Sequence, residues 1–419
     1  MAEAALASVH SSVPDPSSIP LEALNVAQAE IFQANVHGEY FRRLRREAPV
    51  HFCPDSQFGP YWSITKYNDI MAVDTDHTRF SSERDIVIGD QPQGFAPPMF
   101  IAMDNPKHDA QRKTVQPAVA PQRLNELQDL IRQRVITILD SLPVGEEFDW
   151  VERVSKELTT QMLATLFDFP FEDRHLLPYW SDVTTTSETV GVEVDMNERQ
   201  RVLGECLEYF SRLWRERAAQ PMKFDFISLL AHGEDTKDMI DKPEEFLGNL
   251  MLLIVGGNDT TRNSISAGVV ELNRNPEEYA KLTANPDLVT NMVSEIIRYQ
   301  TPLGHMRRTA LEDVDFRGQK IKKGDRVVMW YVSGNRDEEV IDRPDEFLID
   351  REKARQHLSF GFGIHRCMGN RVGEMQLRIL WEEILQRFER VEVVGEPERV
   401  LSNFVMGYSK LPVVLHAKA

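Results

Sequence analysis

Near the C-terminus, residues 360–369 read FGFGIHRCMG, so that a single cysteine ends a loop punctuated by three glycines. Glycine lets the backbone fold tightly around the sulfur of Cys367. A helical pattern follows at about residues 368–388, and a helix there directs its N-terminal amides toward a negative charge. A lone cysteine is more often a small buried apolar residue, but this setting favours a thiolate ligand to haem iron.

A different interpretation of the same loop is a cysteine nucleophile, with His365 as its base. Residues two apart on a tight loop usually point away from each other. No carboxylate or amide nearby is evidently placed to orient the imidazole. We therefore favour the metal ligand over the nucleophile.

A second unusual segment lies in residues 243–273, which read as one long helix with an apolar first half, interrupted by GGNDTT. Each glycine costs about 1 kcal/mol relative to alanine in a helix interior, and buried acids and hydroxyls need partners. A solvent-exposed polar face is the ordinary explanation. We instead expect a functional kink, where Gly256 and Gly257 let a flat cofactor and O2 approach the backbone, while Asp259 and Thr260 provide a proton route.

Most of the chain carries helical periodicity, and short strand-like pieces are few. The clearest helices are expected at residues 124–142, 150–167, 197–218 and 289–299. Strands are expected at residues 50–53, 61–65, 314–316, 326–329 and 413–415. The predicted fold class is therefore mainly α with small β-sheets.

The helical pattern fails between residues 84 and 105, where glycines and prolines are frequent. Ile86, Phe95, Met99 and Phe100 supply apolar surface within this segment. Such a loop can cover an apolar pocket, although an ordinary surface crossing has the same pattern.

No linker or fixed-period repeat divides the 419 residues. Residues 1–20 are rich in Ala, Ser and Pro and are expected to form a disordered arm, and residues 21–419 a single domain. No apolar run reaches the roughly 18 residues that a membrane span requires, and the N-terminus shows neither a signal-peptide pattern nor a membrane anchor. We expect a soluble, cytoplasmic protein.

Charge and cysteine content argue against other classes of protein. The net charge of -18 would repel nucleic acid and anionic lipid alike. Cys53, Cys206 and Cys367 are odd in number and far apart, which gives neither a disulfide framework nor zinc-site spacing. A reducing compartment fits this pattern, and neither nucleic acid nor a membrane is expected as a partner.

The stretch at residues 360–369 resembles the haem-binding signature of the cytochromes P450, in which a phenylalanine and two glycines precede the cysteine and a third glycine follows it. GGNDTT likewise resembles the oxygen-binding segment of that family. The likeness covers nearly the whole chain and implies the single-domain P450 fold, with haem b held by the Cys367 thiolate. It also implies a monooxygenase that takes O2 as co-substrate and receives electrons from NAD(P)H indirectly, through redox partners.

The same resemblance implies roles for polar residues near the haem. Thr260 would contact the iron-bound oxygen, and Asp259 would relay protons from solvent. The haem propionates would be bound by His108, Arg112, Arg308 and His365. Arg307 is the neighbouring alternative to Arg308, which we prefer because the family places its arginine two residues before the small residue that is Ala310 here.

A structural role is implied for Glu295 and Arg298 in EIIR, which would otherwise be an ordinary surface ion pair three residues apart on a helix. In the P450 family this pair joins an arginine from a later loop, here expected to be Arg351, and holds the haem-binding loop.

Three stretches look closest to the soluble bacterial alkane hydroxylases, namely MLLIVGGNDTTRNSI, TPLGHMRRTALEDVDFRG and HLSFGFGIHRCMGNR. That likeness implies terminal (omega) hydroxylation of medium-chain alkanes or fatty acids. The candidate substrate-binding residues are almost all apolar, which suits a linear hydrocarbon without hydrogen-bonding groups, although each alone could be plain core packing. They are Phe95, Met99, Phe100, Leu253, Gly257, Leu303, Gly304, Met306, Phe404, Val405 and Met406.

No strand followed by GxGxxG and a helix is present, so electrons are expected from a ferredoxin and its reductase. Lys107, Arg112, Lys113 and Arg366 could form a basic docking patch, or be scattered solvated charges. We expect a monomer. The alternatives are a monooxygenase of a bulkier hydrophobe such as a terpene, a peroxide-driven enzyme, and a non-catalytic haem sensor or carrier. Asp259 and Thr260 disfavour the peroxide-driven enzyme, and the thiolate and the absence of a signalling domain disfavour the sensor.

Overall fold

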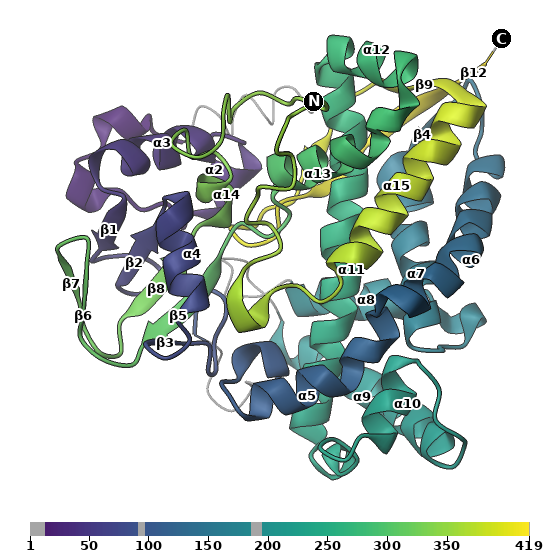
Figure 1. Ribbon diagram of the computed structural model, residues 1–419, viewed down its shortest axis with the longest axis horizontal. Helices are drawn as coiled ribbons and strands as arrows, with labels where there is room; N and C mark the ends of the chain where they lie inside the picture. The colour runs from purple at the N-terminus through teal and green to yellow at the C-terminus, as the bar shows by residue number, and fades with distance from the viewer. Residues whose placement is uncertain (1–12, 91–96, 186–194, 419) are drawn as a thin grey trace.

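The computed structural model describes residues 13–90, 97–185 and 195–418. A smaller part holds a five-stranded sheet with short helices around it, and a larger part consists mainly of long helices (Figure 1). The prediction of a mainly α fold with small sheets is therefore confirmed. Among the described residues, no helix combines the length and the apolarity needed to cross a bilayer.

The helices account for most of the regular structure. The α-helices are α2 Ala29–Gln33, α3 His37–Glu47, α4 Tyr67–Thr75, α5 Lys107–Val115, α6 Pro121–Asp140, α7 Glu157–Leu166, α8 Leu176–Thr185, α9 Met196–Ala218, α10 Phe226–His232, α11 Pro243–Arg274, α12 Pro276–Ala284, α13 Val289–Gln300, α14 Tyr331–Gly334 and α15 Asn370–Arg387. A π-helical turn, η5 Val151–Lys156, leads into α7, and short 3₁₀ turns include η3 Phe100–Ala102 and η10 Gly363–His365.

The largest sheet has the strand order β1-β2-β8-β5-β3, in which only the β2–β8 pair is parallel. Its strands are β1 Val50–Cys53, β2 Tyr61–Ile64, β3 Phe80–Ser81, β5 Met306–Ala310 and β8 Arg326–Met329. A three-stranded sheet joins β4 Glu147–Asp149, β12 Pro412–Ala417 and β9 Phe388–Val393, and two hairpin-like pairs join β6 Val314–Phe316 to β7 Gln319–Ile321 and β10 Glu398–Arg399 to β11 Tyr408–Lys410.

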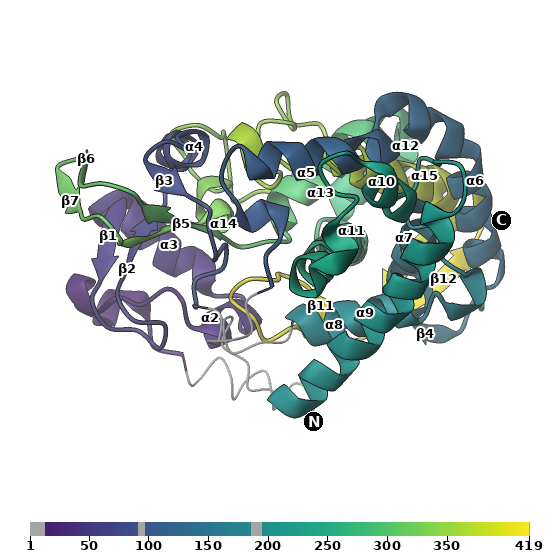
Figure 2. The ribbon, with the colours of Figure 1, turned by 90° about the horizontal axis from the view of Figure 1, so that it is seen from below.

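α11 runs through the middle of the helical part and packs against α7, α8, α13 and α15 (Figure 2). Most of its side chains are buried. A Cβ atom at Gly268 would lie 2.9 Å from Cδ1 of Ile296 and 3.1 Å from Nε1 of Trp381. Glycine at this position therefore allows α11 to approach α13 and α15 closely.

The prediction of one long helix at residues 243–273 is confirmed, because α11 is helical from Pro243 to Arg274. The hydroxyl of Thr260 donates to the backbone carbonyl of Gly256 at 3.1 Å, as serine and threonine commonly do inside helices. The polar segment is thus accommodated within a continuous helix rather than by a break.

The N-terminal segment is described from residue 13 onward. Val13, Ile19 and Leu21 pack against a buried cluster around α2 and α3, and the Arg43 guanidinium donates to the carbonyl of Ile19 at 2.6 Å. Residues 13–20, which belong to the arm expected to be disordered, are therefore in contact with the rest of the protein.

Candidate haem-thiolate site

The loop that carries Cys367 is shaped by glycines in the left-handed region. Gly361 has a φ of +63° and Gly363 a φ of +66°, and a Cβ at Gly363 would lie only 2.6 Å from the carbonyl oxygen of Asp74. The amide of Cys367 donates to the carbonyl of Phe360 at 2.8 Å. The loop is thereby pressed against α4, and α15 starts three residues after the cysteine.

The surroundings of the Cys367 sulfur contain opposing influences on its charge. The residue has accessible surface, but its sulfur lies deep among protein atoms, and this burial raises the pKa of the thiol. Backbone amides of Gly369 and Asn370 and the cations of Arg112 and Arg366 act in the opposite direction and lower the pKa. The expected support from the helix N-terminus is therefore present, and neither ring nitrogen of His365 bonds to this sulfur.

The four predicted propionate ligands come together from three separate segments. The rings of His108 and His365 lie 4.2 Å apart, centroid to centroid. Burial lowers the pKa of His365 to about 2, and the neighbouring Arg308, His108 and Arg112 add to this effect. The cluster therefore concentrates positive charge and hydrogen-bond donors beside the cysteine loop.

Two of these residues have further contacts that fix their position. The buried Arg308 donates to Oδ1 of Asp74 at 2.7 Å and to the carbonyl of Arg307 at 2.9 Å. Arg112 donates to the carbonyl of Arg366, next to the cysteine. Sequence reasoning missed Asp74, because this acid near the end of α4 has no motif around it.

Asp74 connects the cation cluster to the cysteine loop. Its Oδ2 accepts hydrogen bonds from the Tyr331 hydroxyl and from the amide of Phe362, both at 2.8 Å. The carboxylate is almost completely buried and forms an ion pair with Arg308. One side chain thus joins α4, β5, α14 and the loop.

The preference for Arg308 over Arg307 agrees with the alternation of side chains along β5. Arg307 extends away from the cluster, where its Nη1 donates to Asp90 at 2.7 Å and to the carbonyl of Ile88 at 3.4 Å. Arg308 is the arginine of this pair whose charge lowers the pKa of His365.

The residues present suit the two carboxylates of a haem. The buried Nε2 of His108 and both ring nitrogens of His365 have no hydrogen-bond partner among the described residues. His108 donates through Nδ1 to Asp109 at 2.7 Å, so a donor at Nε2 requires the doubly protonated ring. Burial lowers the pKa of His108, and Asp109 opposes this effect. Unpaired nitrogens beside two arginines fit anionic groups.

Asp259 lies fully buried on α11 and is held by Arg262, one turn later. Arg262 donates to Asp259 at 2.8 Å and to Asp182 of α8 at 2.9 Å. Burial raises the pKa of Asp259, and Arg262 opposes this while Asp182 adds to it. Because the Asp182 side chain is 43% exposed, the three side chains connect the buried acid to the surface. The three-residue spacing could have suggested Arg262 as the partner.

The two glycines of this helix have different surroundings. A Cβ at Gly256 would meet open space, as expected for close approach of a cofactor. A Cβ at Gly257 would lie 2.6 Å from Cδ2 of Leu163, so this glycine serves the packing of α11 on α7. The structure therefore does not support Gly257 as a pocket-lining residue.

Glu295, Arg298 and Arg351 form a buried network. The Arg298 guanidinium contacts both carboxylate oxygens of Glu295 at 2.7 and 2.8 Å, and Arg351 Nε donates to the same carboxylate at 3.0 Å. Arg298 also donates to three backbone carbonyls, those of Asn335, Pro344 and Glu346, at 2.8–3.0 Å.

The candidate substrate residues fall into several places. Leu303, Met306, Phe404 and Val405 share one apolar cluster with Ile86 and Val87. Gly304 lies beside it, where its amide donates to the Phe404 carbonyl at 2.7 Å. Phe100 and Leu253 belong to the core of the helical part, and Met99 is half-buried. Met406 packs with Trp330 in the cluster around α2 and α3, and Phe95 lies outside the described residues.

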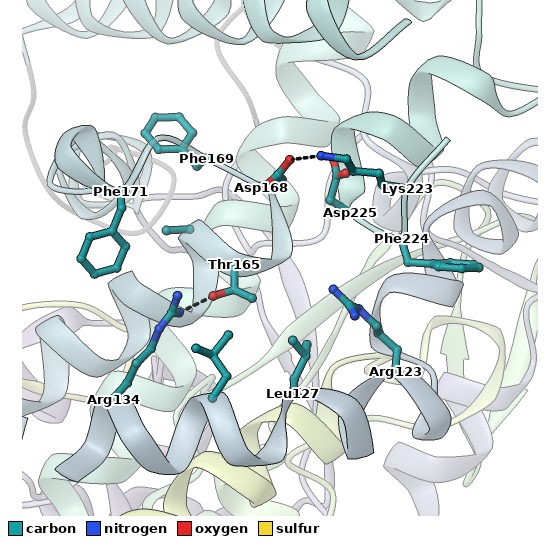
Figure 3. Close-up of a pocket in the computed structure, with 12 residues that line it drawn as sticks. Arg123, Leu127, Arg134, Thr165, Asp168, Phe169, Phe171, Lys223, Phe224 and Asp225 are labelled. Atoms are coloured by element: carbon teal, nitrogen blue, oxygen red, sulfur yellow. Dashed lines mark hydrogen bonds and ion pairs between the residues drawn. The ribbon is translucent and has the colours of Figure 1, made fainter. Parts of the chain in front are cut away.

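A surface cavity of about 330 Å³ lies elsewhere, between α6, α7 and the turn before α10 (Figure 3). Arg123 and Arg134 point into it, and Asp168 pairs with Lys223 at its edge. Of the described site residues, none lines this cavity. It is therefore separate from the site built around Cys367.

Comparison with known proteins agrees with this geometry. The family model described as cytochrome P450 matches residues 108–413. The chain belongs to the cytochrome P450 family. Members of this P450 family are haem-thiolate monooxygenases that use O2 and receive electrons from NAD(P)H through redox partners, and the site around Cys367 contains the groups that such a haem requires.

Individual P450 relatives span nearly the whole chain. Linalool 8-monooxygenase from Pseudomonas putida is 35% identical over 95% of this chain and 100% of its own length. Methyl-branched lipid omega-hydroxylase from Mycobacterium tuberculosis is 29% identical, over 95% of this chain and 96% of its own. The solved structure of cytochrome P450-153 from Novosphingobium aromaticivorans has a TM-score of 0.88 and 45% identity, covering 94% of this chain and 100% of that one.

The buried network predicts a large effect of Arg298→Ala on stability and haem content. Removing the guanidinium leaves three buried carbonyls without their donor and the Glu295 carboxylate with Arg351 as its remaining cation, which should cost about 3–5 kcal/mol in the free energy of unfolding. We expect the purified variant to carry little haem, measured from the haem-to-protein absorbance ratio and from denaturant unfolding.

A matched control is Arg201→Ala on α9, because Arg201 pairs with Glu198 at the same three-residue spacing but on the surface. This change should leave both the free energy of unfolding and the haem content close to those of the wild-type protein, because exposed ion pairs contribute little to stability. An Arg298→Ala protein with full haem loading and a normal spectrum would contradict the structural role of this network.

Proposed function

We propose that this P450 inserts one oxygen atom of O2 into an unactivated C–H bond at the end of a medium-chain alkane or fatty acid, with electrons supplied by a ferredoxin. The observation that carries the substrate class is the apolar cluster formed by Ile86, Val87, Leu303, Met306, Phe404 and Val405. None of these side chains can form a hydrogen bond, and a hydrocarbon requires none.

Two relatives support an apolar substrate and differ on its shape. The methyl-branched lipid omega-hydroxylase is named for reaction at a chain end. The relative named for linalool favours the alternative, a monooxygenase of a bulkier hydrophobe such as a terpene. The likeness of three stretches of sequence to alkane hydroxylases favours the linear substrate.

In the proposed mechanism, Cys367 supplies the thiolate ligand of the haem, and His108, Arg112, Arg308 and His365 bind its propionates. Haem held by a thiolate supplies the oxygen-activating chemistry. Met99, Phe100 and Leu253 are proposed to line the substrate pocket. Glu295, Arg298 and Arg351 are proposed to hold the haem-binding loop.

We also propose that the protein is a monomer in the cytoplasm.

Proton delivery is proposed for Asp259 and Thr260. Asp259 is buried with a raised pKa, so it can hold a proton near neutral pH more readily than an exposed carboxyl. Arg262 holds one of its oxygens and links it to the exposed Asp182. Thr260, the next residue, is partly exposed and carries the hydroxyl that would pass a proton on.

A ferredoxin is proposed as the electron donor because Lys107, Lys113 and Arg366 are exposed near the cysteine loop, where an acidic partner could dock. Lys107 already forms an ion pair with Glu245 at 2.7 Å, and this pairing weakens its attraction for an acidic ferredoxin. Lys113 and Arg366 are therefore the stronger candidates.

Optical titration tests the substrate class. Octane and dodecanoic acid should convert the ferric haem to the high-spin form at lower concentrations than a bulky terpene does, because a narrow apolar pocket excludes the wider molecule. A high-spin shift with the terpene alone would discard the linear substrate and keep the monooxygenase.

Replacing Thr260 should separate electron use from product formation. In Thr260→Ala the alcohol formed per NAD(P)H consumed should fall by roughly an order of magnitude, with more hydrogen peroxide released, since a proton donor of the catalytic step is lost. Thr260→Ser retains a hydroxyl and serves as the control. Full coupling without extra peroxide in Thr260→Ala would show that Thr260 has no part in proton delivery.

Docking of an acidic ferredoxin predicts a salt-dependent reduction rate. The rate measured by stopped flow should fall as ionic strength rises, and Lys113→Glu should slow reduction more than Lys223→Glu, which changes the same residue type at the remote surface cavity. A rate independent of salt would contradict the basic docking patch.

A further inference from the structure

His305, just before β5, is a buried histidine that the proposed chemistry does not use. Its side chain is completely buried. One ring nitrogen, Nδ1, lies 3.1 Å from the carbonyl oxygen of Asn403, and the other, Nε2, lies 3.1 Å from the amide nitrogen of Ile88. The ring thus touches two backbone segments far apart in the sequence.

The two partners fix the chemical form of this ring. A carbonyl can only accept, so Nδ1 carries the proton, and an amide N–H can only donate, so Nε2 presents its lone pair. His305 is therefore neutral, with one defined tautomer. Burial also lowers its pKa to about 3, which keeps the ring in this form near neutral pH.

Both segments carry residues of the proposed pocket. Val87, one residue before Ile88, packs directly with Phe404 and Val405, which follow Asn403. The imidazole lies between them, with ring centroids 4.8 Å from Trp330 and 5.3 Å from Phe404. The distance between these two apolar walls is consequently set at His305.

The two walls differ in how firmly they are held by other bonds. The wall at residues 402–406 has its own backbone bonds, including Gly304 to Phe404 at 2.7 Å and Met406 to Pro302 at 2.9 Å. The Asn403 side chain also donates to the Ala27 carbonyl at 2.7 Å. This wall does not need the Nδ1 bond to stay in place.

The wall at residues 86–88 depends more on the strand beside it. The amide of Arg307 donates to the Ile86 carbonyl at 2.8 Å, and the Arg307 guanidinium reaches the Ile88 carbonyl and Asp90. The amide of Ile88 has His305 Nε2 as its acceptor. His305 and Arg307, which have no proposed role at the haem, thus hold this wall together.

We propose that His305 is a positioning residue for substrate specificity, which holds residues 86–88 against residues 402–405 and so makes the pocket narrow enough to prefer linear over branched hydrophobic molecules. The Nε2 bond to Ile88 carries this role, because the opposite wall is secured independently. The inference rests on the proposed function in one respect, namely that this apolar cluster lines the substrate pocket.

Two substitutions separate the two bonds of the ring. In His305→Gln an amide oxygen can reach the position of Nε2 and accept from Ile88. In His305→Asn the shorter amide reaches only the position of Nδ1, and the Ile88 bond is lost. His51→Asn is the control, because His51 is a buried histidine on β1 that bonds a different backbone carbonyl, that of Leu21.

Each haem-loaded variant is compared by hydrogen exchange and by substrate titration. In His305→Asn the peptide containing Ile88 should exchange faster, and the ratio of dissociation constants for linalool and octane should change about tenfold, the effect of a methylene-sized misfit in an apolar pocket. His305→Gln and His51→Asn should stay close to the wild-type protein in both measurements.

Faster exchange without a changed ratio, or unchanged exchange, would overturn the proposal. If His305→Asn does not bind haem, Val87→Ala is tested in its place. Shortening the Val87 side chain alters the same apolar wall, so the ratio of dissociation constants for linalool and octane must change. An unchanged ratio in Val87→Ala would also overturn the proposal. This test is separate from the test of the proposed substrate. A wild-type protein that prefers linalool would refute the linear substrate. The hydrogen exchange at Ile88 and the change in the ratio of dissociation constants would still test the role of His305.

Discussion

The buried guanidinium of Arg298 links the helical part of the protein to the loop that carries Cys367. Besides Glu295, it donates to the carbonyl of Asn335, whose side chain in turn accepts from the Leu358 amide at 2.6 Å and donates to the Ser359 hydroxyl at 2.9 Å. A charge with no exposed surface has to be completely paired, because an unpaired charge in a protein interior is very unfavourable. The loop before the cysteine is thus fixed through one residue, Asn335, to a cation that cannot move without breaking several bonds.

A second buried charge fixes the other side of the same loop. Asp74 pairs with Arg308 and accepts from Tyr331 and from the amide of Phe362. The Arg298 network contacts the loop before its glycines, at Leu358 and Ser359, through Asn335. Asp74 contacts the loop between two glycines, at the amide of Phe362. Between these two anchors, the loop holds the sulfur beside the amides of Gly369 and Asn370. The geometry of the haem ligand is therefore a consequence of buried electrostatics on both sides of the loop.

Local patterns were enough to predict much of this structure. Strands β1, β6 and β8 occupy the residues expected from alternating apolar residues, and α9 and α13 begin and end within one residue of the expected helices. The cysteine loop was recognised from its glycines and its following helix, whereas the cation cluster and the EIIR pair were predicted from their resemblance to P450 motifs. Each of those motifs is short, although the structure brings the four residues of the cluster together from three separate segments.

The rest could not be predicted because it depends on contacts between distant segments. Asp74 has no neighbouring motif, and its importance appears only when α4 meets the loop almost 290 residues later. Gly257 looked like a space for a cofactor, but Leu163 of α7 occupies that side. His305 likewise joins Ile88 to Asn403, two residues that share no pattern in the sequence.

The most direct measurement is the carbon monoxide difference spectrum of the reduced protein, recorded for the wild type and for Cys367→Ser. A thiolate ligand gives the strongly red-shifted Soret band of the P450 family, and the substitution should abolish that band while the protein still folds. A wild-type protein without the shifted band, or a Cys367→Ser protein that retains it, would contradict Cys367 as the haem ligand.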